Sequence, residues 1–436
     1  MTDPEHVVVA GAGLAGLRTV EELRDRGYAG RVTLVGAEAR LPYDRPPLSK
    51  KLMIGELDDT TLRPDLDALD VQARLAERAV GLADGTLATD RGRYEFDALV
   101  LATGASPVTL PGPGRQHVLR TLDDALALRP LLRPGTALAI VGAGWIGAEL
   151  ATAAAALGCR VTVVEAAAVP LAAALGPEVG GQTAAWYAAA GVDLRLGQGV
   201  DSVQPGGLAL AGGGWLPADV VVTAIGVRPA VAWLAGSGVE VGNGICVDEQ
   251  LRTSVPGVFA VGDCAAFESA RYGARLRFEH WDVALHAPEV AAANVLGGGE
   301  TYDPVPYFWS EQFGRMVQYV GYHGGAGQLV WRGDPTESER PPEQASGTGV
   351  PGGTGVPGGT AVPGGTAGPG GRNAAAGRSG HRWAAAWLDG DRLVALLSVN
   401  SPRDMLQGRR VISSGAPVDP DRLADPQIPV RDCVLT

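Results

Sequence analysis

The stretch His6-Val-Val-Val-Ala-Gly11-Ala-Gly13-Leu-Ala-Gly16 has the order of a strand, a glycine-rich turn and the start of a helix. A second strand, Arg31-Val-Thr-Leu-Val35, follows that helix, and Glu38 lies just past its end. In such a unit the first glycine makes a tight turn, the second lets the backbone approach a pyrophosphate, and the third lets the helix pack on the strand. The helix N-terminus attracts phosphate charge, and the acid accepts hydrogen bonds from a ribose. The stretch therefore predicts a dinucleotide site in a doubly wound α/β domain.

The same pattern returns in the middle of the chain. It reads Ala139-Ile-Val-Gly142-Ala-Gly144-Trp-Ile-Gly147-Ala-Glu149, and the strand Arg160-Val-Thr-Val-Val164 and Glu165 follow it. One such pattern is a weak signal, because similar glycines occur in ordinary loops. Two copies, each in the strand-turn-helix context and each followed by an acid, predict two bound dinucleotides and electron or hydride transfer between them.

Length and composition limit the classes of protein to which this chain can belong. At 436 residues the chain is long enough for about three domains, and 46% hydrophobic with 19% charged residues is typical of globular proteins. The apolar start, Val7 to Val9, is too short for a signal peptide or a membrane span, so we expect a cytoplasmic protein that binds no membrane. A net charge of -12 argues against nucleic-acid binding, which needs a basic face.

The four cysteines are scattered, with no C-x-x-C and no metal-type spacing. The sequence therefore predicts no metal site, no sequence-adjacent redox dithiol and no iron-sulfur centre within this chain. We expect at least three of the four to be small buried residues. They are Cys159, Cys246, Cys264 and Cys433.

Strand and helix patterns alternate as far as about residue 300, and the second glycine pattern lies inside that alternation. One nucleotide-binding domain is therefore expected to be inserted into the other. Aromatic, strand-like segments after Pro304 predict a third, α+β domain with an antiparallel sheet. A Pro/Gly-rich run with a six-residue period predicts a disordered surface loop, which we interpret as a tolerated insertion. The expected boundaries are 1–110 with 233–303, 111–232, and 304–436, with the loop at 337–378.

Two further strands end in small or acidic residues, where open parallel sheets place their ligands. One ends in Ala102-Thr103-Gly104, and the other in Val261-Gly262-Asp263. Asp263 is a candidate for sugar or ribityl hydroxyls, and the alternative is a helix N-cap.

The segment Leu41-Pro-Tyr-Asp-Arg-Pro-Pro-Leu-Ser-Lys50 is more specific than the glycines. Together with Glu279-His-Trp281 and Tyr307-Phe-Trp-Ser310, it resembles the FAD-dependent, NADH-using ferredoxin reductases. These serve cytochrome P450 and Rieske oxygenase systems, and apoptosis-inducing factor is a relative. The resemblance covers nearly the whole chain except the Pro/Gly-rich run.

The resemblance implies that the first pattern binds FAD and the second binds NAD(H). The implied FAD residues are Gly11, Gly13, Ala15, Gly16, Glu38, Arg45, Lys50, Ala102, Thr103, Gly104, Asp263, Glu279, Trp281 and Trp309. The implied NAD residues are Gly142, Gly144, Trp145, Ile146, Gly147, Glu165 and Gly226.

The resemblance also implies a catalytic pair: Lys50 lies near the flavin, and Glu149 forms an ion pair with Lys50. A fixed cation stabilises the negative charge that a hydride brings to the flavin, and Glu149 would keep that cation from being buried unpaired. The alternative for Glu149 is an acid that serves the helix dipole. Trp281 and Trp309 match the aromatic residues around the flavin, although a tryptophan is otherwise most often a core residue.

Glu165 predicts the choice of coenzyme. A carboxylate that binds the ribose 2'-hydroxyl repels a 2'-phosphate, so NADH is preferred and NADPH binds more weakly. The run Ala166-Ala-Ala-Val-Pro170 lacks the basic residue that many relatives have after this acid, which makes the expected preference modest.

The resemblance implies a separate [2Fe-2S] ferredoxin as electron acceptor and, indirectly, a P450 or Rieske oxygenase downstream. An acidic ferredoxin requires a local basic patch, for which Arg315, Arg403, Arg409 and Arg410 are candidates, with solvated surface as the alternative. Rubredoxin reductase stays open, since only the acceptor differs. A disulfide reductase is disfavoured by the cysteine pattern, and a non-catalytic flavoprotein of the apoptosis-inducing-factor type ranks low.

Overall fold

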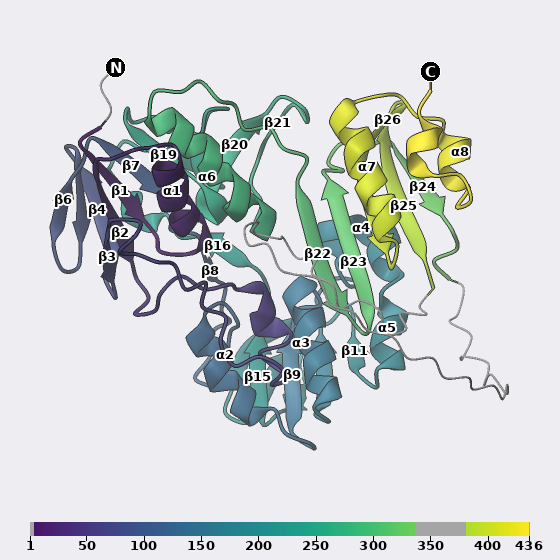
Figure 1. Cartoon of the computed structure of the whole chain (residues 1–436). Helices are drawn as coiled ribbons and strands as arrows, with labels where there is room; N and C mark the ends of the chain where they lie inside the picture. Colours follow the sequence, from purple (N-terminus) through teal and green to yellow (C-terminus); the bar gives the residue numbers. More distant parts are fainter. Residues whose placement is uncertain (1–3, 337–380, 436) are drawn as a thin grey trace, which may run out of the picture.

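The computed structural model describes residues 4–336 and 381–435, so the expected insert at 337–378 lies outside the described residues. Figure 1 shows three bodies: two carry helices on parallel strands, and the third has an antiparallel sheet. The predicted fold class is confirmed.

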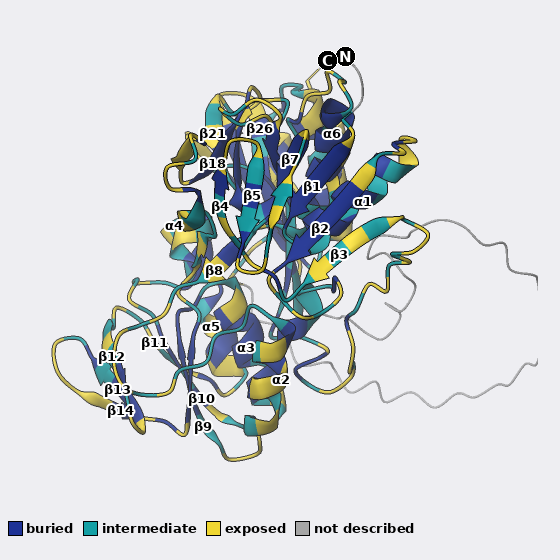
Figure 2. Ribbon diagram, turned by 90° about the vertical axis from the view of Figure 1, so that its left-hand side faces the viewer, coloured by how far each residue is buried: buried dark blue, intermediate teal, exposed yellow. Residues whose placement is uncertain are grey.

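The first body is a five-stranded parallel sheet with strands from distant parts of the chain. Figure 2 shows β1 (His6–Ala10) and β7 (Ala98–Leu101) buried along their length, as expected for parallel strands covered on both faces. Helices α1 (Leu14–Asp25) and α6 (Trp281–Val295) pack side by side (Figure 1). The sheet order is β19 (Val258–Ala260), β7, β1, β2 (Arg31–Gly36) and β3 (Val71–Leu75).

Small sheets and turns complete the first body. An antiparallel sheet comprises β4 (Ala79–Ala83), β5 (Thr86–Thr89) and β6 (Arg93–Glu95). A mixed sheet comprises β17 (Val241–Gly242), β18 (Gly244–Val247), β20 (Ala265–Ser269) and β21 (Ala274–Leu276). The 3₁₀ helices are η1 (Pro46–Ser49), η3 (Ala232–Leu234) and η4 (Gly262–Cys264).

The second body is inserted into the first. The chain leaves the first body along β8 (Ala105–Pro107) and returns along β16 (Val227–Pro229), and these two strands pair antiparallel. Between them lies a four-stranded parallel sheet in the order β11 (Asp193–Arg195), β10 (Arg160–Val164), β9 (Ala137–Val141) and β15 (Val220–Thr223). The other elements are α2 (Leu122–Leu128), η2 (Arg129–Leu131), α3 (Trp145–Ala156), α4 (Ala172–Gly181), α5 (Ala184–Ala189), β12 (Val200–Gln204), β13 (Gly207–Leu210) and β14 (Trp215–Pro217).

One segment expected in the first domain packs in the core of the second body. Leu48, Leu52 and Met53, on and after η1, belong to the same hydrophobic cluster as Ile140 of β9. The domain boundaries at residues 110 and 232 stay predictions, but the turn after η1 is anchored to the second body.

The third body is a five-stranded antiparallel sheet. Helix α7 (Pro402–Ser414) packs on one face, and α4 of the second body packs on the other. The aromatic segments form four of its strands as predicted. The sheet order is β22 (Tyr307–Gln312), β23 (Arg315–Gly321), β26 (Arg392–Val399), β25 (Trp383–Asp389) and β24 (Gln328–Arg332), followed in the chain by α7, α8 (Pro420–Ala424) and η5 (Val430–Cys433).

All four cysteines are free, and Cys246, Cys264 and Cys433 are buried, which confirms their expected structural character. In the described ranges, no group of three or more His, Cys, Asp or Glu side chains is placed to hold a metal ion. No helix of residues 4–336 and 381–435 is both long and apolar enough to cross a membrane.

Arg332, at the end of β24, is buried and ties the sheet to the C-terminal segment. Its guanidinium donates to the carbonyl oxygens of Asp425 and Ile428 at 2.5 and 2.6 Å and also to those of Leu423 and Pro426. These carbonyls have no water to replace the donor if it is lost, so the arginine stabilises the third body.

We expect Arg332→Met to lower the free energy of unfolding of the third body by about 3 kcal/mol, the scale of removing one member of a buried charged network. Denaturant unfolding followed by tryptophan fluorescence measures this, since Trp383 and Trp387 lie in this sheet. Arg392→Met, at an exposed position of β26, is the matched control and should leave stability unchanged. Equal effects of the two substitutions on the free energy of unfolding would contradict the stabilising role of Arg332.

Candidate active site

The first glycine pattern forms a cradle with one open position. A Cβ on Gly11 would collide with the carbonyl of Ala102, and one on Gly16 would collide with the carbonyl of Gly11. A Cβ on Gly13 would meet nothing within 4 Å. Gly13 also precedes α1 without a side-chain cap, so the helix N-terminus faces an open space. This geometry fits a dinucleotide pyrophosphate.

The second pattern repeats this arrangement. A Cβ on Gly142 would collide with the carbonyl of Ala224, and one on Gly147 with that of Gly142, whereas Gly144 faces open space. Gly144 precedes α3, again without a side-chain cap. The chain therefore has two sites with the same fit to a pyrophosphate.

Each acid lies beside its cradle. Glu38 accepts hydrogen bonds from the hydroxyl of Tyr43 at 2.6 Å and from Arg45 at 2.7 Å. Glu165 accepts from the backbone N–H groups of Ala143 and Ala167 at 2.7 and 2.8 Å, so its carboxylate is fixed at the second glycine turn. Because each carboxylate oxygen has two lone pairs, both acids retain acceptor capacity for ribose hydroxyls.

Asp263 pairs with Arg120 at 2.7 Å, and the Arg120 carbonyl accepts a hydrogen bond from Arg45 at 2.6 Å. The alternative for Asp263, a helix N-cap, is wrong: the 3₁₀ helix η4 has Val261 as its N-cap residue, and β20 follows. Arg120 was not predicted from sequence. The available signal is that Arg120 directly precedes Thr121, which opens the capping box of α2.

The predicted pairing of Lys50 with Glu149 is present, with Lys50 Nζ 2.7 Å from a Glu149 carboxylate oxygen. The Glu149 side chain is only 2% exposed. It also accepts hydrogen bonds from Ser49 and, at 2.7 Å, from Ser310 of β22. Glu149 lies beyond the first turn of α3, which has no acid, so the helix-dipole alternative loses its geometric basis. Sequence reasoning missed the two serines, although both lie inside the segments that carry the resemblance.

An aromatic series lies beside this pair. The Trp281 indole donates to Asp44 at 2.8 Å and meets Trp309 edge to face at 5.7 Å, and Trp309 stacks on Tyr307 at 6.0 Å. Burial raises the pKa of Asp44, against the hydrogen bond from Trp281 and the charge of Lys50. Asp44 was not predicted, and it fixes the orientation of Trp281.

Trp145, at the start of α3, packs on Phe308 at 4.8 Å, and Phe308 lies 5.1 Å from the ring of His280. Burial lowers the pKa of His280 to about 4, so this histidine is neutral at pH 7. Its Nδ1 is buried and has no hydrogen-bond partner among the described residues. An unpartnered polar atom beside Trp281 is an observation that fits a polar cofactor.

Of the remaining predicted residues, two make side-chain contacts with other protein groups, and four lie in helix turns or loops. Glu279 forms an ion pair with Arg277 at 2.8 Å, and its role at the cofactor stays a prediction. Thr103 donates to the carbonyl of Ala230 at 2.9 Å. Ala15 and Ile146 lie in the first turns of α1 and α3, next to the two cradles, and Gly104 and Gly226 lie in loops and have positive φ.

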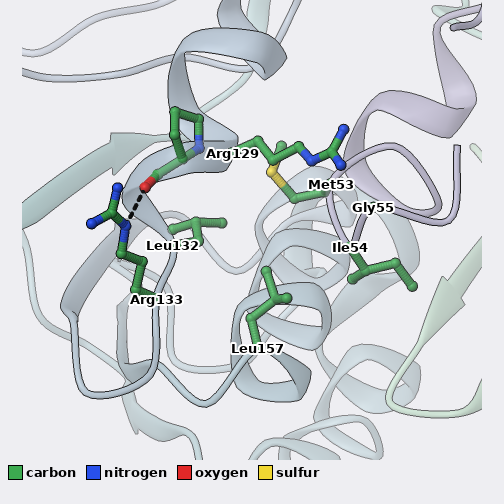
Figure 3. A pocket seen from close by; sticks show the side chains of 8 residues that line it. Met53, Ile54, Gly55, Arg129, Leu132, Arg133 and Leu157 are labelled. Atoms are coloured by element: carbon green, nitrogen blue, oxygen red, sulfur yellow. Dashed lines mark hydrogen bonds between the residues drawn. The ribbon is translucent and has the colours of Figure 1, made fainter. Parts of the chain in front are cut away.

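A separate hollow of about 300 Å³ lies behind the turn that follows Lys50 (Figure 3). Figure 3 shows Met53 and Ile54 on one side, Leu132 and Arg133 on the other, Leu157 below, and the Arg129 side chain extending above Met53. It has neither a glycine cradle nor a candidate acid, so we assign it no nucleotide.

Comparisons with known proteins agree with this geometry. The family model described as pyridine nucleotide-disulphide oxidoreductase matches residues 5–287. The chain belongs to this family. A second model, described as reductase C-terminal, matches residues 307–341 and 365–434.

The relatives match this chain over nearly its whole length. The ferredoxin--NAD(+) reductase component of the p-cumate 2,3-dioxygenase system of Pseudomonas putida is 33% identical, with 99% of each chain covered. The crystal structure of Fdr9 is 44% identical with a TM-score of 0.85, covering 98% of this chain and 99% of that one. The covalent putidaredoxin reductase-putidaredoxin complex matches at 28% identity and a TM-score of 0.85, with 98% of each chain covered.

This member of the pyridine nucleotide-disulphide oxidoreductase family is therefore an enzyme that uses FAD and NAD(H), as predicted. The roles of the individual site residues stay predictions.

We expect Lys50→Ala to slow reduction of bound flavin by NADH about 100-fold, the scale of losing one preorganised electrostatic group. FAD retention should fall much less, because the two cradles are untouched. Stopped-flow absorbance of the flavin bands gives the rate, and the absorbance ratio of flavin to protein gives the retention. Lys51→Ala, at the exposed neighbouring position, is the control. A wild-type rate in Lys50→Ala would exclude the role.

Proposed function

We propose that this enzyme is an NADH-dependent ferredoxin reductase. It passes electrons from NADH to a separate [2Fe-2S] ferredoxin that serves a cytochrome P450 or Rieske-type oxygenase. When bound, FAD supplies the ability to accept two electrons from NADH and to give them up singly. The names of the relatives support a ferredoxin partner, and four free cysteines fit a reducing cytoplasm.

In this proposal the first cradle holds FAD, with Glu38, Arg45 and Asp263 on its sugar and phosphate groups. The second cradle holds NADH, with Glu165 on the ribose. Lys50 provides a fixed positive charge between the two sites, and Glu149 pairs with that lysine and fixes its orientation. Trp281 and Trp309 exclude water from the site.

The observation that carries the proposal is where the aromatic series ends. The series starts at Trp281 in the site and passes through Trp309 to Tyr307. The guanidinium of Arg409, on α7, lies over the Tyr307 ring at 5.8 Å. The series thus connects the site to the helix that covers the outer face of the third body, as single-electron transfer to a docked protein requires.

The surface of α7 fits an acidic partner. Arg403, Leu406 and Arg410 are exposed at spacings of three and four residues, so they share one helix face, which we name the α7 patch. Leu406 is 56% exposed, and an apolar centre flanked by charge is typical of docking surfaces. Arg315 lies elsewhere: its guanidinium lies over the ring of Trp186, and we leave it out of the patch.

Anaerobic titration of the purified protein tests the electron donor. Stoichiometric NADH should bleach the flavin bands faster than NADPH does, because Glu165 repels a 2'-phosphate. Glu165→Gln removes that charge, leaves one amide oxygen to accept from the two backbone N–H groups, and should reduce the ratio of the NADH rate to the NADPH rate by about tenfold, the size of a modest charge repulsion. A yellow protein that neither coenzyme reduces would refute the catalytic proposal.

Reversal of charge in the α7 patch tests the acceptor. Arg403→Glu with Arg410→Glu should raise the KM for an acidic [2Fe-2S] ferredoxin about tenfold at low salt, while ferricyanide reduction by NADH stays unchanged. Arg91→Glu, an exposed position in the first body, is the control. Efficient reduction of rubredoxin instead of ferredoxin would reassign the acceptor.

A further inference from the structure

One buried carboxylate is shared by two cations at the boundary between the first and third bodies. Asp282, in the first turn of α6, has a side chain that is 6% exposed. One of its oxygens lies 3.4 Å from Nδ1 of His286, and the other lies 3.6 Å from Arg409 of α7. Asp282 therefore links the helix that begins at Trp281 to the helix that carries the α7 patch.

Arg409 occupies a central position in this cluster. Its guanidinium contacts both Asp282 and the ring of Tyr307, the last member of the aromatic series. It also lies next to Arg410 in the sequence. A change in how firmly Asp282 holds Arg409 therefore reaches both the end of the aromatic series and the edge of the α7 patch.

His286 is placed to change that hold. Its Nδ1 is 2.8 Å from the backbone carbonyl of Asp282, and because a carbonyl only accepts, Nδ1 donates. Protonation then occurs at Nε2, on a side chain that is 49% exposed. The hydrogen bond to Asp282 raises the pKa of His286 above its usual 6.5, although burial and the charge of Arg409 oppose this.

We propose that His286 is a positioning residue that makes docking of the acidic ferredoxin dependent on pH. Once His286 is protonated, two cations compete for Asp282, and the hold on Arg409 weakens. The boundary beside the α7 patch then carries one more positive charge. Both effects favour an acidic partner, so docking tightens as the pH falls through the pKa of His286. This inference rests on the proposed function.

The other groups that face this cluster do not titrate in the same range. Arg409 faces it from α7 and stays charged. Tyr307, from β22, keeps its proton near neutral pH, because burial raises its pKa, and the same holds for Tyr302. His280 also interacts with Asp282, but burial lowers its pKa to about 4, so it stays neutral in this range. Among the described groups that face Asp282, His286 is thus the one whose charge changes between about pH 6 and 8.

The test is the KM for ferredoxin between pH 6 and pH 9 at constant ionic strength, with a panel of acidic [2Fe-2S] ferredoxins that includes putidaredoxin. In the wild type the KM should fall about threefold toward low pH, the size of one partly exposed charge interaction. His286→Asn keeps a donor for the Asp282 carbonyl and cannot become charged, so its KM should stay at the high-pH level. His286→Arg is charged throughout and should stay at the low-pH level. A wild-type pH profile in His286→Asn overturns the inference.

Two further measurements separate this inference from the proposed function. Ferricyanide reduction by NADH should be the same in all three proteins, because His286 is outside the cofactor sites. The imidazole resonance of His286, assigned through His286→Asn, reports its pKa by NMR, and Arg409→Gln should raise that pKa. An unchanged pKa overturns the shared-carboxylate model even if ferredoxin is reduced. Absence of ferredoxin reduction at every pH, with the expected NMR shift, refutes the proposed acceptor instead.

Discussion

The carboxylate of Glu149 is the constraint on which the arrangement of this molecule depends. It is almost fully buried, and an isolated buried charge is too costly to tolerate. Its partners come from two places: Lys50 and Ser49 from the turn of the first domain, and Ser310 from the third-domain sheet. Since α3 supplies Glu149 from the second body, one charge is satisfied only when all three bodies are assembled.

The same constraint positions the aromatic wall relative to the lysine. Ser310 and Trp309 are neighbours on β22, and successive strand residues point to opposite faces. Ser310 therefore points toward Glu149 while Trp309 is directed to the other side, where it meets Trp281. A second bond, from the Phe313 N–H to Thr152 of α3 at 3.0 Å, holds the end of this strand to the same helix. Moving β22 would thus displace the aromatic series and disturb the ion pair together.

Sequence patterns predicted the two cradles because much of the need for glycine is local: Gly11 and Gly142 have positive φ, and the carbonyls that would collide at Gly16 and Gly147 belong to the same turns. The Lys50–Glu149 pair was accessible only through family resemblance, because no periodicity relates a turn to a helix 99 residues away. Arg120 and Asp44 were missed for a related reason. Each is a common surface residue type, and its partner, Asp263 or Trp281, lies more than one hundred residues away in the chain. Long-range polar pairs leave no signature in one sequence, whereas turns and strands do.

The charge distribution reconciles an acidic protein with an acidic partner. The chain carries a net charge of -12, so at long range it repels an acidic ferredoxin. The Debye length in physiological salt is about 8 Å, however, so a partner near the surface responds mainly to the nearest charges. On α7 those are Arg403 and Arg410, exposed beside Leu406, with the partly exposed Arg409 held by Asp282. A buried acid can thus restrain one arginine without cancelling the two exposed ones. In the proposed docking mode, net acidity discourages nonspecific encounters with acidic proteins, and productive docking takes place on α7, where the aromatic series ends.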